Sequence, residues 1–222
     1  MIYKGQILVV TIDGPAGAGK STIAKKLAKA LEVSYLDTGA MYRALTLKAM
    51  RESVNMESED DLIALAKRTV IDIENLDCGV KVFLDGEDVS QEIRTVEVTN
   101  NTFYIARAAG VRSIMVEWQR EMGSRKSVVI EGRDVGTVVF PNATRKYYLD
   151  ADVEERARRR YDELIAKGKE VDFSDVLNDV KVRDEKDFTR KVGPLKKAED
   201  AVVIDSTKMT IDEVVEEMKN KI

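Results

Sequence analysis

The most constraining feature of the sequence is the stretch Gly14-Pro-Ala-Gly-Ala-Gly-Lys-Ser-Thr22, which lies between a short apolar segment and an amphipathic one. It matches the phosphate loop G-x-x-x-x-G-K-[ST], in which glycines let the backbone curl until several N–H groups point at one centre. The apolar segment Ile7–Asp13 precedes it, and Ile23, Leu27 and Leu31 follow at helical spacing. A glycine turn that matched the motif by chance would not require a strand before it and a helix after it. We therefore predict a strand, a loop and a helix that bind a nucleoside triphosphate.

The loop also supplies two side chains with the right chemistry for a triphosphate. Lys20 would bridge the β and γ phosphates, and the hydroxyl of Ser21 would be a ligand of Mg²⁺. The whole set expected to surround the phosphates is Gly14, Pro15, Ala16, Gly17, Ala18, Gly19, Lys20, Ser21 and Thr22.

Further short apolar segments recur along the chain, and each ends at an acidic residue. Near-continuous apolar runs of this length are typical of buried parallel strands. Helical patterns separate them, so we predict a five-stranded, doubly wound α/β sheet that binds its ligands at the carboxyl edge. With Ile7–Asp13, the predicted strands are Val33–Asp37, Ser127–Glu131, Lys146–Asp150 and Ala201–Asp205. The predicted helices are Met41–Arg51, Glu59–Thr69, Thr95–Gly123, Val153–Lys167, Phe173–Lys191 and Ile211–Lys221.

One stretch breaks this alternation of strands and helices. Val70–Ile73 and Val80–Leu84 have the pattern of strands, and Asp85-Gly86 is a hairpin turn signal. We therefore predict a small antiparallel insert over about 70–94.

Two loops at predicted strand ends carry charged residues. After the second strand, Thr38 can cap a helix that begins near Ala40, which places Tyr42 and Arg43 in its first turn. An arginine there could clamp an acceptor phosphate, although an ordinary capped helix with a surface arginine has the same spacing. After the third strand, Arg133 and Asp134 stand between two glycines, as a substrate contact or as a local ion pair.

Two later helices also carry charged faces. Arg156, Arg159 and Arg160 fall within one sector of the first, where an anion would offset their mutual repulsion; a solvated charged face is the alternative. The second presents Arg183, Asp187 and Arg190 at i, i+4 and i+7, a spacing that a salt-bridge ladder shares.

Composition excludes several kinds of protein. The chain has no histidine, which rules out any mechanism that needs an imidazole, and its only cysteine, Cys78, rules out an intrachain disulfide. The net charge of −4 disfavours a nucleic-acid binder. No apolar run approaches the ~20 residues that span a bilayer, and the N-terminal MIYKGQILVV lacks the features of a secretory signal. We expect a cytoplasmic protein with no membrane or nucleic-acid partner.

Several of these stretches together closely resemble bacterial-type cytidylate kinase, a nucleoside monophosphate kinase. The resemblance runs from about Ile7 through nearly the whole chain. It includes the phosphate loop with the Ile12-Asp13 that precedes it, Leu36-Asp-Thr-Gly-Ala-Met-Tyr-Arg43, Gly86-Glu-Asp-Val-Ser, Glu92-Ile-Arg-Thr, Gly132-Arg-Asp-Val-Gly-Thr-Val-Val-Phe-Pro141 and Asp205-Ser-Thr.

The resemblance implies phosphoryl transfer from Mg·ATP to CMP or dCMP, with ATP and Mg²⁺ as cofactors. It implies a P-loop kinase core over 1–37, 106–150 and 171–222, a CMP-binding insert over 38–105 and a lid over 151–170. Lys20, Arg133 and the lid residues Arg156, Arg159 and Arg160 would be catalytic. The implied CMP-binding residues are Thr38, Tyr42, Arg43, Arg112, Arg133, Asp134, Arg183, Asp187 and Arg190.

Within that scheme, Arg43 and Arg133 hold the CMP phosphate, Asp134 accepts from the cytosine amine, and Arg190 faces the base. Two positions depart from the family pattern: Glu131 stands where many relatives carry Asp, and Phe103 stands where a small hydroxyl residue is expected near the base. The alternatives are another small-molecule kinase on the same scaffold and a regulatory nucleotide switch. We expect a monomer.

Overall fold

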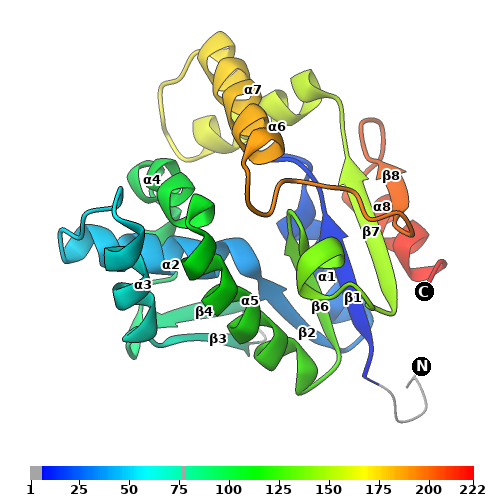
Figure 1. The fold of residues 1–222 in the computed structure, drawn as a ribbon. Helices are drawn as coiled ribbons and strands as arrows, with labels where there is room; N and C mark the ends of the chain where they lie inside the picture. Colours follow the sequence, from blue (N-terminus) through cyan, green and yellow to red (C-terminus); the bar gives the residue numbers. More distant parts are fainter. Residues whose placement is uncertain (1–6, 77–78) are drawn as a thin grey trace.

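The computed structural model describes residues 7–76 and 79–222, so Cys78 and the first six residues lie outside it. A five-stranded parallel sheet forms the centre, in the order β2-β6-β1-β7-β8 (Figure 1). This confirms the predicted α/β core, with strand bounds that differ by one or two residues. The strands are β1 (Val9–Asp13), β2 (Ser34–Asp37), β6 (Val128–Gly132), β7 (Arg145–Asp150) and β8 (Val202–Asp205).

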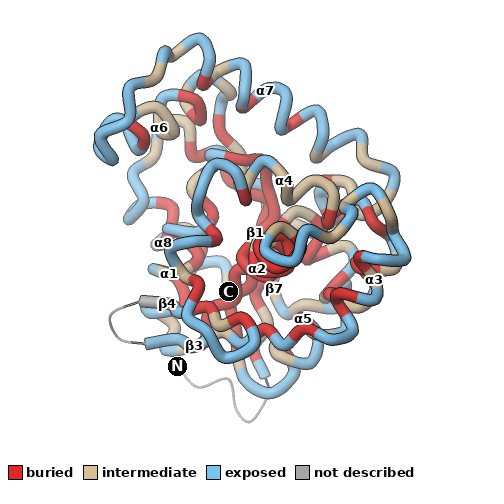
Figure 2. The backbone as a smooth tube through the Cα atoms, turned by 90° about the vertical axis from the view of Figure 1, so that its left-hand side faces the viewer, coloured by how far each residue is buried: buried red, intermediate tan, exposed pale blue. Residues whose placement is uncertain are grey.

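Helices cover both faces of this sheet. Alternate residues along the strands enter two separate cores: Val129 packs with α1 and α8, whereas Ile130 packs with α2 and α5. Figure 2 shows buried residues concentrated along β1 and α2 at the centre, while α7 is largely exposed. The helices are α1 (Lys20–Ala30), α2 (Thr38–Arg51), α3 (Glu59–Lys67), α4 (Val96–Arg107), α5 (Ala109–Ser124), α6 (Val153–Ala166), α7 (Phe173–Thr189) and α8 (Ile211–Lys219).

The predicted antiparallel insert is confirmed. Strands β3 (Ile71–Leu76), β4 (Gly79–Leu84) and β5 (Glu87–Asp88) form a second, three-stranded sheet. The turn between β4 and β5 has positive φ at both Asp85 (50°) and Gly86 (88°), as a tight hairpin turn requires. A 3₁₀ turn, η1 (Glu92–Arg94), leads from this sheet into α4.

The predicted single helix over Thr95–Gly123 is wrong, because the chain breaks at Ala108 into α4 and α5. Helix α3 packs against the start of α5 so closely that a Cβ at Gly110 would lie 2.4 Å from the Cδ1 of Ile63. The Glu59 carboxylate accepts a hydrogen bond at 2.7 Å from the N–H of Gly110, which lies in the first turn of α5. The break therefore lets α5 pack on α3.

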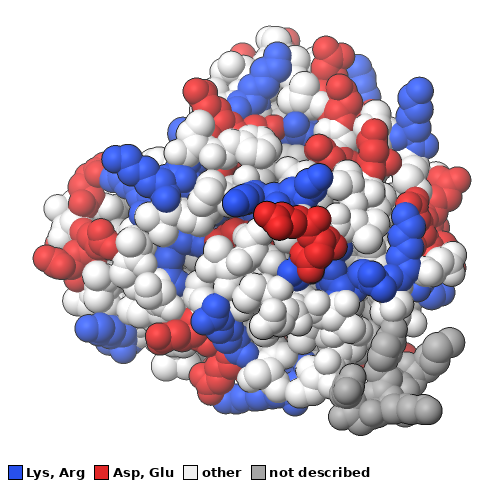
Figure 3. Space-filling view, turned by 45° about the vertical axis from the view of Figure 1, so that its right-hand side comes forward, with Lys and Arg blue, Asp and Glu red and all other residues white. Residues whose placement is uncertain are grey.

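None of the described helices is long and apolar enough to cross a membrane. On the face drawn in Figure 3, positive and negative side chains are interspersed rather than gathered into one field.

Candidate functional site

The phosphate loop joins the central strand β1 to α1, and its shape depends on glycine. Gly14 passes so close to β7 that a Cβ there would lie 2.0 Å from the carbonyl oxygen of Leu149. Gly19 caps α1 at φ 88°, a left-handed conformation that side chains disfavour. The loop therefore presents the N-terminus of α1 at the carboxyl edge of the sheet, where backbone N–H groups favour an anion.

Lys20 turns its side chain back into this loop. Its Nζ donates to the carbonyl oxygen of Pro15 at 2.6 Å, and the residue is 5% exposed. Burial, and then the positive charge of Arg133, lower the pKa of Lys20 to about 7. A phosphate placed beside this ammonium group would favour its charged form.

A buried acidic pair lies next to the loop, at the ends of β2 and β6. Asp37 and Glu131 are register partners, and Glu131 accepts from the hydroxyl of Tyr35 at 2.6 Å, while Ser21 of the phosphate loop is near enough to act on the pKa of Glu131. Burial, and then the charge of Asp37, raise the pKa of Glu131. Hydroxyl and carboxylate oxygens are the ligands that Mg²⁺ prefers, so this donor set fits the ion.

The start of α2 differs from the prediction, because Asp37 and not Thr38 caps the helix. Asp37 Oδ1 accepts from the N–H of Ala40 at 2.9 Å, while Thr38 Oγ1 donates to the carbonyl oxygen of Glu131 at 2.7 Å. The other Asp37 oxygen accepts from Arg43 at 3.0 Å. Burial acts to raise the pKa of Asp37, but Arg43 and the Ala40 N–H outweigh it and lower that pKa.

Arg43 retains unused hydrogen-bonding capacity. Its Nε is buried and has no hydrogen-bond partner within the described part of the chain. A buried donor without a partner is costly, and an oxyanion bound in the planar fork of the guanidinium would satisfy it.

The loop after β6 holds two predicted site residues in ion pairs. Arg133 Nε donates to Asp187 of α7 at 2.6 Å. Asp134 accepts from Arg112 of α5, and Arg112 also donates to the hydroxyl of Tyr42 at 3.1 Å. The Arg112 and Asp134 side chains are 5% and 8% exposed. The structure thus brings together residues from α2, α5, α7 and this loop that are far apart in sequence.

Helix α7 faces that loop with the three residues predicted to share one face. Asp187 pairs with Arg133 and lies 3.7 Å from Arg190 of its own helix. Desolvation, and then the charge of Arg133, lower the pKa of Arg183. Arg190 ends the helix, and its Nε donates to the carbonyl oxygen of Gly193. The main partner of Asp187 therefore comes from another element, which a simple salt-bridge ladder along α7 does not explain.

Of the three predicted lid arginines, Arg156 is the one that contacts the phosphate loop. It is 6% exposed, and it donates to the carbonyl oxygens of Ala16 and Ala151, each at 2.9 Å. Its charge is balanced by Asp184 of α7 at 2.7 Å. This guanidinium therefore connects α6, the phosphate loop and α7.

The other two predicted lid arginines have different partners. Arg159 donates to Glu155 at 3.0 Å and to the carbonyl oxygen of Ser206, just after β8, at 2.7 Å. Arg160 is paired with Glu163 on the exposed side of α6 at 2.8 Å. All three arginines thus have partners within the chain, and those partners differ, although their spacing puts them within one sector of the helix.

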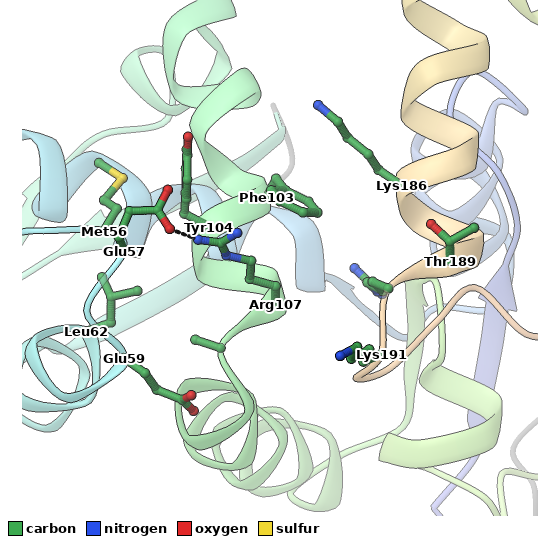
Figure 4. Close-up of a pocket in the computed structure, with 12 residues that line it drawn as sticks. Met56, Glu57, Glu59, Leu62, Phe103, Tyr104, Arg107, Lys186, Thr189 and Lys191 are labelled. Atoms are coloured by element: carbon green, nitrogen blue, oxygen red, sulfur yellow. Dashed lines mark hydrogen bonds and ion pairs between the residues drawn. The ribbon is translucent and has the colours of Figure 1, made fainter.

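A pocket of about 510 Å³ separates the insert from the end of α7 (Figure 4). Phe103 of α4 lies on one side, with Lys186 of α7 opposite at 5.4 Å from Phe103's ring centre. Arg107 lies 5.4 Å from the same ring, and Arg190 also lines the pocket. Phe103 therefore places an aromatic ring in the same pocket as Arg190, a predicted CMP-binding residue.

Sequence reasoning missed two partners that complete the site. Asp184 neutralises Arg156, and Tyr35 donates to Glu131. Asp184 lies in the charged run of α7 and three residues before Asp187, which is a weak signal. Tyr35 lies in the short strand β2, whose sequence indicates burial without revealing a polar partner for the tyrosine hydroxyl.

Comparison with known proteins shows the family to which the chain belongs. A sequence model of the family described as cytidylate kinase matches residues 10–222. The cytidylate kinase of Desulforamulus reducens is 55% identical over 208 residues, covering 93% of this chain and 92% of that protein. The cytidylate kinase of Bacillus subtilis is 46% identical over 211 residues, covering 95% and 94%.

Among solved structures, a shikimate kinase from Bacteroides thetaiotaomicron aligns over 97% of this chain and 98% of its own, with a TM-score of 0.50. At 15% identity, that likeness concerns the fold alone. The sequence matches are far stronger, since they combine about half identity with nearly complete coverage of both chains. The chain belongs to the cytidylate kinase family.

Proposed function

We propose that the chain transfers the γ-phosphoryl group of Mg·ATP to CMP or dCMP, giving ADP and CDP or dCDP. The observation that carries this proposal is that the phosphate loop and the cluster around Arg43, Arg133 and Asp134 meet at one edge of one sheet. Family membership supplies the identity of the acceptor.

On the ATP side, the backbone N–H groups of residues 14–22, all except Pro15, receive the phosphates, and Lys20 exchanges the carbonyl oxygen of Pro15 for phosphate oxygens. The hydroxyl of Ser21 would be a ligand of Mg²⁺, and the nearby carboxylate of Glu131 would help to hold the ion. Once bound there, the ion would neutralise charge on the phosphate oxygens. Among the described residues no set of three acidic, histidine or cysteine side chains could hold a metal ion, which fits an ion held largely by substrate phosphates.

On the acceptor side, Arg43 and Arg133 bind the monophosphate. Both lie beside carboxylates that a phosphate would replace, Asp37 and Asp187. A phosphate oxygen is already ionised near neutral pH, so the transfer needs positioning and charge neutralisation more than a general base. The absence of histidine from the sequence is consistent with such a reaction.

The base is read at the Arg112–Asp134 pair. A carboxylate can accept from the amine of cytosine, and uracil presents a carbonyl oxygen at the same place. Arg190 faces the base, and Arg183 with Asp187 contacts the ribose. Thr38 and Tyr42 complete the acceptor site; burial raises the pKa of Tyr42 to about 12, which keeps its phenol neutral.

Residues 151–170 form the lid, and 38–105 form the acceptor-binding insert on the core of 1–37, 106–150 and 171–222. Closure of the lid excludes water, which otherwise competes as the acceptor. Arg156, Arg159 and Arg160 would then stabilise charge on the transferred group, with Arg156 already in contact with the loop. The site is formed within one chain, in keeping with a monomer, and the reaction suits a cytoplasmic enzyme.

The test is ADP formation from Mg·ATP with CMP, dCMP, UMP, AMP, GMP or no acceptor. We expect turnover with CMP and dCMP well above that with the other monophosphates. Turnover of none of them, with slow ATP loss in all samples, would contradict the acceptor assignment and favour another P-loop kinase or a nucleotide switch. Size-exclusion chromatography with light scattering tests the monomer.

A further inference from the structure

Asp13 is a buried carboxylate that the proposed substrate roles leave unexplained. It is the last residue of β1, directly before the phosphate loop, and it is 3% exposed. Its register partners are Gly132 of β6 and Tyr148 of β7. It therefore lies at the carboxyl edge of the sheet, between the phosphate loop that follows it and the loop that follows β6. A carboxylate buried at such a point needs hydrogen-bond donors, and its donors identify what it holds.

Both donors are backbone groups of the loop that carries Arg133 and Asp134. Asp13 Oδ1 accepts from the N–H of Val135 at 2.9 Å, and Oδ2 accepts from the N–H of Gly136 at 2.7 Å. These N–H groups belong to the first two residues of η2 (Val135–Val139), a single π-helical turn. Such turns are rare and recur at functional sites. The carboxylate thus fixes the backbone directly after the two acceptor residues.

The fit around this turn is close. A Cβ at Gly136 would lie 2.9 Å from Oγ1 of Thr11 and 3.2 Å from Oδ2 of Asp13, so glycine is what lets the turn reach the carboxylate. The other end of the loop is held from α2, where Thr38 donates to the carbonyl oxygen of Glu131 at 2.7 Å. The backbone on either side of Arg133 and Asp134 is therefore held by hydrogen bonds, to Thr38 before them and to Asp13 after them.

We propose that Asp13 is a positioning residue for acceptor binding: by holding the N–H groups of Val135 and Gly136, it sets where Arg133 and Asp134 meet the monophosphate. The inference rests on the acceptor roles proposed above for those two residues. In this proposal Asp13 acts through the backbone of the loop and not through a contact with the substrate. A shift of the loop by a fraction of an ångström would misplace the guanidinium and the carboxylate together, because they are adjacent in the chain.

The test is Asp13→Asn, which keeps the size of the side chain but replaces one accepting oxygen with an amide that faces an N–H donor. We expect KM for CMP to rise about tenfold or more and the preference for CMP over UMP to fall, while KM for ATP stays within twofold. The matched control is Asp205→Asn at the end of β8, an exposed carboxylate that accepts from the N–H of Thr207 at 2.9 Å. The control should leave all three quantities unchanged.

A second variant, Gly136→Ala, keeps the carboxylate but crowds the turn, and it should produce the same split between the two KM values. Thermal unfolding of each variant reports whether it folds. Equal changes in both KM values, or a lowered melting temperature with unchanged KM for CMP, would overturn the positioning role. An inactive wild type would refute the proposed acceptor and this inference with it, whereas an active wild type with an unaltered Asp13→Asn variant refutes this inference alone.

Discussion

Replacing Asp134 with asparagine separates base recognition from the rest of the acceptor site. The side chain keeps its size, but one accepting oxygen becomes an amide group that donates. In the structure, this carboxylate accepts from Arg112 in a pair whose side chains are 5% and 8% exposed. Burial raises the pKa of Asp134, and Arg112 and Arg190 act against that shift. The substitution therefore alters both the contact to the base and a buried ion pair.

The substitution should change two measurable quantities, the preference for CMP over UMP and the stability of the fold. A hydrogen bond to a charged group is worth about 1.5–3 kcal/mol, so the ratio of kcat/KM for CMP to that for UMP should fall about 10- to 100-fold. Loss of one partner of a buried ion pair costs about 3–5 kcal/mol. The lower end applies here, because the hydroxyl of Tyr42 still accepts from Arg112 at 3.1 Å. For a chain of this size, about 3 kcal/mol lowers the melting temperature by about 6–12 °C.

The assay is coupled ADP formation with CMP and with UMP, alongside thermal unfolding. Asp184→Asn is the matched control, since it weakens another buried arginine–aspartate pair, that with Arg156 on the ATP side. It should lower stability and affect KM for ATP without altering the CMP to UMP ratio. A ratio for Asp134→Asn within twofold of the wild type would refute the role of this carboxylate in reading the base.

Three further predictions concern single side chains. Phe103→Ser removes the ring beside Lys186, and we expect a loss of about 1 kcal/mol, seen as a fall of about 2–4 °C in melting temperature, with KM for ATP unchanged. Arg43→Gln should raise KM for CMP about tenfold or more in steady-state assays, whereas Arg51→Gln on the same helix, an arginine paired with exposed glutamates, should not. Burial raises the pKa of Asp13 from 3.8 to about 6, so the folded chain binds this proton more readily than the unfolded chain does. Its contribution to stability therefore falls by about 3 kcal/mol as pH rises from about 4 to about 6, and urea unfolding of Asp13→Asn should lack this slope. Parallel stability curves for wild type and variant would contradict that shift.

The core was predictable because its signals are local. Each parallel strand is a short apolar run, and the phosphate loop occupies the turn after the central one, as the structure confirms. The hairpin at Asp85-Gly86 was equally readable, since positive φ at consecutive positions favours few residue pairs. Family resemblance then predicted acceptor-site residues in several separate elements, and the structure brings Tyr42, Arg112 and Asp134 among them into contact.

What could not be predicted depends on packing between distant elements. The chain breaks at Ala108, where α3 packs against the start of α5, and the one local signal of this break is Gly110, a residue that helix interiors also tolerate. Either Asp37 or Thr38 could cap α2, and the choice follows from the carbonyl oxygen of Glu131, which takes the threonine hydroxyl. Charge partners such as Asp184 are also set by three-dimensional proximity.

The internal carboxylate partners of the site arginines change what a substrate must do on arrival. Arg43, Arg133 and Arg156 each pair with an aspartate of the same chain, so under the proposed function an incoming phosphate replaces a counterion instead of meeting an unpaired charge. The exchange gives little to a small, weakly charged anion, which cannot compensate for the displaced aspartate. It rewards a ligand that engages several guanidiniums at once, as a nucleotide does. Under the proposed function, these aspartates therefore disfavour the binding of inorganic anions relative to that of a nucleotide.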